Sequence, residues 1–156
     1  GIRHEVIVFD MARFLGYGER ALGLVSRLTT HETAHILMHK RWPVLAEDVP
    51  YRRQLQHLCF DEGFAHLLAC GEAIASFDFG GWVDQHWEPS LQKLREALAC
   101  TDPEKQQECL IRANAGPYWE KFACITGKLY LAQHRDQLFS IYSEGPDRFL
   151  PELFLP

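Results

Sequence analysis

Apolar residues recur at helical spacing along the first half of the chain. From residues 19 to 42 they recur near helical spacing, and the Trp-Pro step at residues 42–43 ends the run. Thr29 or Thr30 could cap a second helix inside this run, so it predicts one long helix or two shorter ones. A second periodic run begins after Pro50 and predicts a helix over about residues 51–74.

The second half of the chain continues the helical pattern. A glycine pair predicts a loop over residues 77–81. Each later apolar run opens with proline or a polar residue, as helix starts do. The expected helices cover residues 89–99, 103–113, 117–133 and 136–142. The only short β-branched and aromatic run, residues 5–9, predicts a strand. The expected fold class is therefore mainly α, with at most a short β element near the N-terminus.

Length and charge narrow the class of protein. A chain of 156 residues suits one domain over residues 1–156, and its 47% hydrophobic and 24% charged residues argue against a disordered chain. The net charge of −5 makes nucleic acid an unexpected partner, because binding phosphates needs a basic surface. No apolar run is long enough for a membrane span.

The chain ends and the cysteines bear on cellular location. The sequence opens on Gly1 without methionine, so we expect a trimmed chain whose leader, if it had one, would be missing. Five cysteines without paired spacing favour reduced thiols and hence the cytoplasm. Cys100 and Cys109 flank a Thr-Asp-Pro turn signal and are the one pair that could form a disulfide.

The residues His31-Glu32-Thr33-Ala34-His35 form an HExxH motif. Side chains four positions apart share one helix face, so two imidazoles can bind one Zn²⁺ while the glutamate between them reaches a water on the metal. The motif is short enough to arise by chance, and a surface stripe of histidines is the alternative interpretation.

A catalytic zinc site needs a third protein ligand. His39 continues the stripe, but a rise of ~1.5 Å per residue places it ~12 Å from His31 along the helix axis, too far for one ion. The extended metzincin motif requires glycine and histidine where this chain has Met38 and Arg41. The remaining source is a carboxylate on a second helix, which the segment 61–65 (Asp-Glu-Gly-Phe-Ala) offers.

With this segment the sequence resembles the gluzincin metallopeptidases, whose HExxH helix is followed by a helix carrying a glutamate ligand in a similar string. By that resemblance Glu62 is the third ligand, and Gly63 and Ala65 are small enough to let the two helices approach. The segment 116–127 is similar to the late helix of uncharacterised families described as predicted zinc-dependent proteases.

The resemblance implies zinc-dependent hydrolysis of peptide bonds in a peptide or protein substrate. His31, His35 and Glu62 would hold the zinc, and Glu32 would take a proton from water and pass it to the leaving amine. Gluzincins also use a tyrosine or histidine to stabilise the oxyanion. The candidates here are Tyr118 and Tyr130, followed by His66 and His57.

The chain departs from the gluzincin pattern in two ways. Some gluzincins carry an acid where this chain has His66, so we place His66 beside the ligands and take Asp61 and Glu72 as possible partners of a ligand imidazole. Gluzincins also have a β-sheet before the HExxH helix. The segment 5–9 could pair with substrate as an edge strand or only tether the N-terminus, which we favour.

Two other functions stay open at this stage. A non-catalytic module could keep zinc for stability, or use the scaffold to bind a peptide or protein. The other alternative is a metal-free helical bundle with surface histidines. The sequence carries no signal for an oligomeric state.

Overall fold

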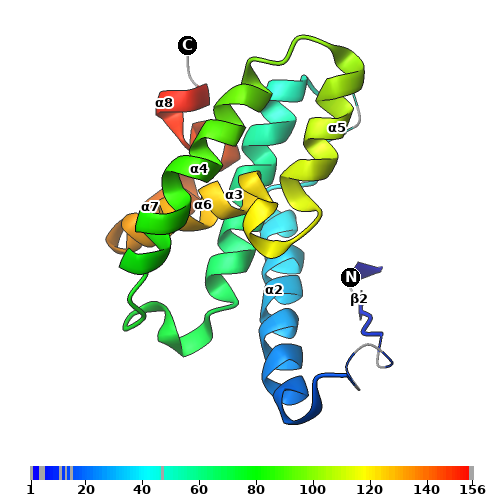
Figure 1. Cartoon of the computed structure of the whole chain (residues 1–156), viewed down its shortest axis with the longest axis vertical. Coiled ribbons are helices and arrows are strands. Elements are labelled where there is room, and N and C mark those ends of the chain that lie inside the picture. The colour runs from blue at the N-terminus through cyan, green and yellow to red at the C-terminus, as the bar shows by residue number, and fades with distance from the viewer. Residues whose placement is uncertain are drawn as a thin grey trace.

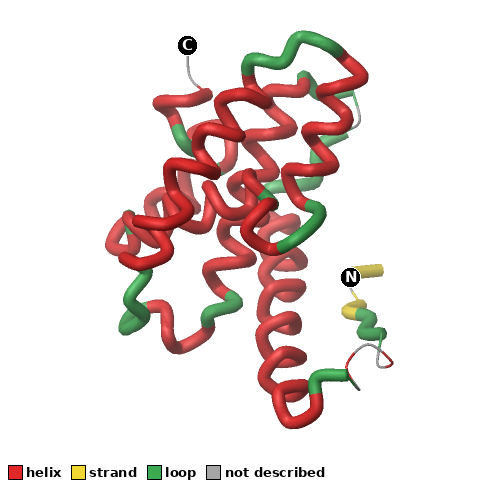
Figure 2. The backbone as a smooth tube through the Cα atoms, viewed as in Figure 1, coloured by secondary structure: helices red, strands yellow, loops and turns green. Residues whose placement is uncertain are grey.

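A computed structural model of the chain describes residues 2–3, 6–10, 12, 14, 16–46 and 48–154. These residues form a mainly helical fold, which confirms the expected class. Figures 1 and 2 show helices packed side by side and joined by loops and short turns. The α-helices are α2 (Ala21–Arg41), α3 (Tyr51–Leu68), α4 (Gly80–Leu98), α5 (Pro103–Asn114), α6 (Phe122–Gln133), α7 (Leu138–Glu144) and α8 (Pro151–Phe154). The 3-10 turns are η1 (Gly18–Arg20), η2 (Gly71–Ile74), η3 (Tyr118–Glu120), η4 (Arg135–Gln137) and η5 (Pro146–Arg148).

The helices α3 and α6 form the centre of the molecule. Helix α6 packs against both α3 and α4, and α3 also contacts α2 and α5 (Figure 1). Ten of the twelve residues of α6 are buried. A helix that is apolar on nearly all sides belongs inside a protein, because no face of it can be left in water without cost. This central pair therefore fixes the position of the helices around it.

Two glycines allow α3 and α6 to approach closely. A Cβ atom added to Gly63 would lie 2.7 Å from the carbonyl carbon of Gly127, and one added to Gly127 would overlap the carbonyl oxygen of Cys59. The expectation for Gly63 is therefore corrected. Gly63 faces α6, so it lets α3 approach α6 rather than the HExxH helix, because it lies on the face of α3 turned towards the core.

Several helix boundaries differ from the sequence expectations. Helix α2 is continuous, and Thr29 and Thr30 donate their hydroxyl protons to carbonyls one turn earlier instead of capping a second helix. Helix α4 begins at Gly80, within the segment 77–81 that was expected to be a loop. Pro89, where a helix was expected to start, lies inside α4. Packing against α6 favours this longer helix over the break that a proline alone would predict.

The N-terminal segment forms a small β element. β1 (Ile2–Arg3) pairs antiparallel with β2 (Val6–Ile7), and β2 lies near α2. The expected strand over 5–9 is therefore shorter than predicted, and Glu5 lies outside the described residues. Each strand has only two residues, which fits a tether better than a platform for an extended substrate.

Two further features concern the cysteines and the membrane. All five cysteines are free thiols, so Cys100 and Cys109 form no disulfide in this structure, and the Cys100 thiol instead points to the carbonyl of Asp102 at 3.6 Å. In the described part of the chain, no helix combines the length and apolar character needed to cross a membrane.

Candidate metal centre

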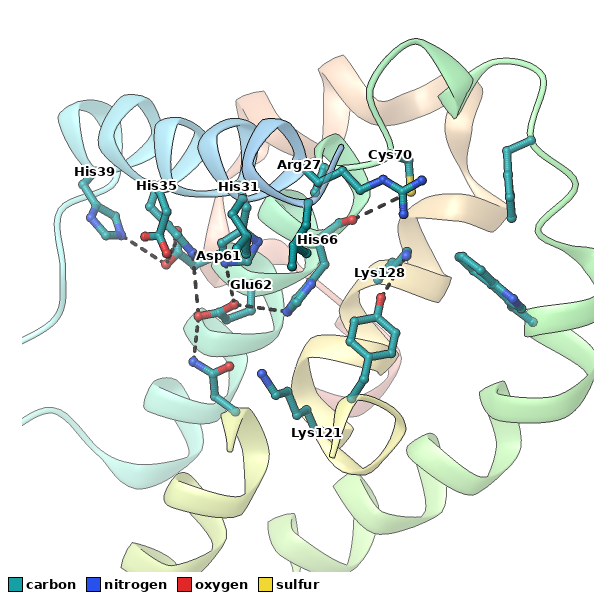
Figure 3. Close-up of a pocket in the computed structure, with 18 residues that line it drawn as sticks. Arg27, His31, His35, His39, Asp61, Glu62, His66, Cys70, Lys121 and Lys128 are labelled. Carbon is teal, nitrogen blue, oxygen red and sulfur yellow. Dashed lines mark hydrogen bonds and ion pairs between the residues drawn. The ribbon is translucent and has the colours of Figure 1, made fainter. Parts of the chain in front are cut away.

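The three histidines of α2 lie along one face of the helix. They are spaced four residues apart, so His31, His35 and His39 follow each other by about one turn. Figure 3 shows their rings directed towards Asp61 and Glu62, which are carried by α3. The packing of α2 against α3 thus brings together the two motifs that the sequence analysis singled out.

The predicted ligand atoms lie at distances that suit a metal ion. The Nε2 atoms of His31 and His35 are 3.1 Å apart. Glu62 Oε2 lies 3.6 Å from the His31 Nε2, and Glu62 Oε1 lies 3.7 Å from the His35 Nε2. Ligand atoms of a tetrahedral zinc ion, with bonds of ~2.1 Å, are ~3.4 Å apart. These groups are therefore close enough to hold a metal ion.

His66 adds a fourth nitrogen to the same cluster. It follows Glu62 by one turn of α3, and its Nε2 lies 3.6 Å from a Glu62 oxygen. Its ring is 4.6 Å from the ring of His31, and His31, Glu62 and His66 form one of the groups whose ligand atoms lie within 4.8 Å of one another. The position expected to lie beside the ligands is thus close enough to be a ligand itself.

Asp61 contacts the outer side of the cluster. One of its oxygens lies 3.0 Å from the His35 Nδ1 and accepts a hydrogen bond from His39 Nε2 at 3.1 Å. A carboxylate at the Nδ1 of a histidine keeps the proton there and leaves the Nε2 lone pair for a metal. Burial raises the pKa of Asp61, but the two histidines outweigh it and hold the pKa below its usual range. Asp61, His35 and His39 also form a second group close enough to hold an ion.

Glu62 has an outer partner that the sequence analysis missed. The side-chain amide of Asn114 donates a hydrogen bond to Glu62 Oε1 at 2.7 Å, and the thiol of Cys124 donates to the Asn114 oxygen at 3.0 Å. Asn114 is the last residue of α5, one position beyond the helix that the sequence predicts. Nothing in the local sequence relates it to Glu62, because the contact depends on how α5 packs against α3.

Burial keeps two of the imidazoles neutral. It lowers the pKa of His31 to about 4, with a further contribution from His35, and it lowers the pKa of His66 to about 3. Burial also tends to lower the pKa of His35, but Asp61 and Glu62 outweigh it and the pKa is raised. Desolvation raises the pKa of Glu62. Neutral imidazoles are the form that binds metals, so His31 and His66 suit this role at pH 7.

The cluster forms one end of a pocket of about 870 Å³. Glu32 lines this pocket, as the HExxH spacing predicts for a residue between two ligands. Aromatic rings and three cationic side chains, Arg27, Lys121 and Lys128, also line the pocket. In Figure 3, Lys121 points towards the cluster, whereas Arg27 and Lys128 lie farther along the pocket, beyond His66.

The two tyrosine candidates lie in different places. Tyr118 lines the pocket, its ring lies 5.5 Å from the His66 ring, and its hydroxyl accepts a hydrogen bond from Lys128. Tyr130 instead packs against Phe149, at 5.2 Å between ring centres, and is not among the residues that line the pocket. The structure therefore does not bring Tyr130 to the site.

One further candidate does not join the pocket either. His57 lies one turn before Asp61 on α3 and is absent from the pocket lining, and burial lowers its pKa. The side chain of Glu72 lies outside the described residues.

Comparison of the chain with protein-family models, with curated proteins and with solved structures finds no match to any of them. The resemblance to gluzincins therefore stays a prediction from the HExxH motif and the segment 61–65.

Proposed function

We propose that the chain is a zinc metallopeptidase that hydrolyses peptide bonds in a peptide or protein substrate. The observation that carries this proposal is the convergence of His31 and His35 with Glu62. These residues come from two helices, and the distances between their ligand atoms run from 3.1 to 3.7 Å. The outer contacts of Asp61 and Asn114 support it further, because partners of this kind orient metal ligands in known sites.

In this proposal His31, His35 and Glu62 hold the zinc. When bound, zinc lowers the pKa of a water molecule towards neutrality and polarises the carbonyl of the scissile bond. Glu32 accepts the proton of the attacking water and delivers it to the leaving amine, and its place in the pocket lining suits this role.

Tyr118 is the residue we propose for the oxyanion. Lys128 donates a hydrogen bond to the Tyr118 oxygen at 2.9 Å, so the hydroxyl proton of Tyr118 is left to donate to another acceptor. Burial raises the pKa of this hydroxyl, which keeps the proton in place at neutral pH. A donor of this type contributes about 3 kcal/mol to transition-state stabilisation.

One observation favours a second function. With His66 as a fourth ligand the site would be closed, and closed four-ligand sites are structural rather than catalytic. The chain would then be a non-catalytic, zinc-stabilised module that binds a peptide or protein. The pocket beside the cluster has room for a peptide and so suits both functions, and the number of zinc ligands is what separates them.

Peptide-library cleavage by wild type and by Glu32→Gln tests the proposal. The Gln variant should keep its zinc, since residue 32 is not a ligand, and lose about 10²- to 10⁴-fold in cleavage rate. Cleavage by the wild type should stop when a chelator removes the metal. Full activity of the Gln variant, or cleavage that survives the chelator, would refute the mechanism.

The variant His66→Ala separates the enzyme from the module. A catalytic site with three ligands should keep zinc in this variant, whereas a closed four-ligand site should lose it. The zinc content of the purified variant is the measurement, and wild type purified in parallel is the control.

A further inference from the structure

The end of the pocket beyond His66, here called the lysine end, holds Arg27 and Lys128, whereas Lys121 points towards the cluster (Figure 3). Arg27 comes from α2, Lys121 directly precedes α6, and Lys128 lies within α6. Within the part of the chain that the structure describes, none of the three is paired with a carboxylate. The acids that line the pocket, Glu32, Asp61 and Glu62, instead belong to the segments that carry the histidines.

Lys128 is the most unusual of the three. Its side chain is only 3% exposed, and its Nζ donates a hydrogen bond to the hydroxyl of Tyr118 at 2.9 Å. The ammonium also lies 4.4 Å from the centre of the Trp82 ring. Aromatic faces and a neutral hydroxyl attract a cation but do not cancel its charge. Desolvation accordingly lowers the pKa of Lys128.

A buried ammonium without a counter-charge costs stability, and an anionic ligand would offset that cost. A lysine has three donor hydrogens, and Tyr118 accepts one of them. The Cys70 thiol also lies near this ammonium, which leaves at least one hydrogen for an oxygen of a carboxylate. Lys128 is among the residues that line the pocket, so a molecule bound there lies beside this residue.

The ammonium lies close to the candidate metal site. The Tyr118 ring that contacts it packs against the His66 ring at 5.5 Å, and the His66 Nε2 is 3.6 Å from Glu62. Only two side chains therefore separate the ammonium from a ligand of the candidate metal. An extended peptide covers ~3.4 Å per residue, so a peptide held at the metal site would place a nearby residue at Lys128.

We propose that Lys128, with Arg27 beside it, binds a carboxylate of the peptide substrate close to the scissile bond. This inference rests on the proposed function for the identity of the substrate. The carboxylate is either the free C-terminus of the peptide or the side chain of an aspartate or glutamate.

Isothermal titration calorimetry with matched peptides tests this proposal and tells the two sources apart. The protein is the Glu32→Gln variant, so that the peptides are not consumed. The probes are acetylated alanine tripeptides with a free or an amidated C-terminus, and amidated acetylated tripeptides containing glutamate or glutamine. We expect one carboxylate probe to bind on the order of 10- to 100-fold more tightly than its neutral counterpart.

The same titration in a background carrying Lys128→Met identifies the responsible group. The methionine keeps the volume and removes the charge, so it should abolish the carboxylate preference and leave the protein folded with an equal or higher melting temperature. Lys105→Met, at an exposed position on α5, is the matched control and should keep the preference.

Three results would overturn the inference: equal binding of charged and neutral probes, a preference that survives Lys128→Met, or no binding of any probe. Cleavage is measured separately, in the peptide-library assay with the wild-type protein. A carboxylate preference in a protein that cleaves no peptide would therefore refute the proposed peptidase while supporting the carboxylate site. Cleavage without any preference would do the reverse.

Discussion

The two ends of the pocket differ in whether their buried charged side chains have partners of opposite charge. At the histidine end, Asp61 contacts His35 and His39, and the amide of Asn114 holds Glu62. At the other end, the buried ammonium of Lys128 contacts aromatic rings, the Tyr118 hydroxyl and the Cys70 thiol, and it has no carboxylate partner among the described residues. The first arrangement would orient the proposed ligands before an ion binds, and the second would leave a positive charge for an anionic ligand to match.

The largest expected effect concerns the third ligand at the histidine end. Replacing Glu62 with alanine removes one of the three proposed ligands, so affinity for zinc should fall by more than 100-fold, beyond the loss usual for an outer partner. Competition between the protein and a chromogenic chelator measures this affinity.

The matched control is Glu88→Ala, which removes an exposed glutamate on α4 and should leave zinc affinity unchanged. Equal zinc affinities of the Glu62 and Glu88 variants would show that Glu62 is not a zinc ligand.

The second effect tests the packing that connects the two ends. In Gly127→Ala the new methyl group would overlap the Cys59 carbonyl, so α6 must move away from α3 and the free energy of unfolding should fall by about 2–3 kcal/mol. Urea unfolding measures the change. In the control Gly23→Ala nothing lies within 4 Å of the new Cβ, and helix propensity should stabilise that variant by about 0.5–1 kcal/mol. An unaltered unfolding midpoint in Gly127→Ala would argue against this packing.

The third effect concerns the outer partner of the histidines. Asp61→Asn keeps the shape but removes the negative charge beside the His35 Nδ1, so zinc affinity should fall by about 10- to 100-fold. The same chelator competition measures it, with the exposed Asp84→Asn on α4 as the control. Unchanged affinity would show that Asp61 has no part in orienting the ligand.

The smallest expected effect concerns the cost in stability of the buried Lys128 charge at the lysine end. Because burial lowers the pKa of Lys128 in the folded protein, the folded state binds this proton less readily than the unfolded chain does. The charge therefore costs stability at pH values below the folded pKa, and that cost disappears as the pH rises towards the unfolded value of ~10.4. At pH 7, Lys128→Met should be more stable than wild type by about 1 kcal/mol, or about 2–4 °C in melting temperature.

Thermal unfolding at pH 7 and near pH 10 measures this difference, which should shrink at the higher pH. A variant that is less stable at pH 7 would show that Lys128 contributes to the fold rather than costing it stability.

The sequence predicts those parts of the site whose contacts join residues close together in the chain. His31 and His35 lie four residues apart on one helix, so their geometry is set by the helix itself. Whether Glu62 or Asp61 is the third ligand depends on how α3 faces α2. Only the resemblance to gluzincins predicted that it is Glu62. In the structure the neighbouring carboxylates take different positions, one between the Nε2 atoms and one at the outer nitrogen of His35.

The residues that the sequence did not predict come from distant segments. Asn114 and Lys128 reach the pocket only because α5 and α6 pack against α3. A signal for Lys128 was present, since it is the only charged residue within the apolar run 122–132. For Asn114 there was none. The sequence predicts the class of fold for the same reason that it predicts the HExxH face, because helical periodicity is a local property.

Native mass spectrometry of the wild-type protein, purified without added metal, tests the central claim most directly. The account predicts a mass excess of one zinc ion per chain, lost on treatment with a chelator together with part of the thermal stability. A metal-free mass, with the same melting temperature in the presence and absence of zinc, would contradict it.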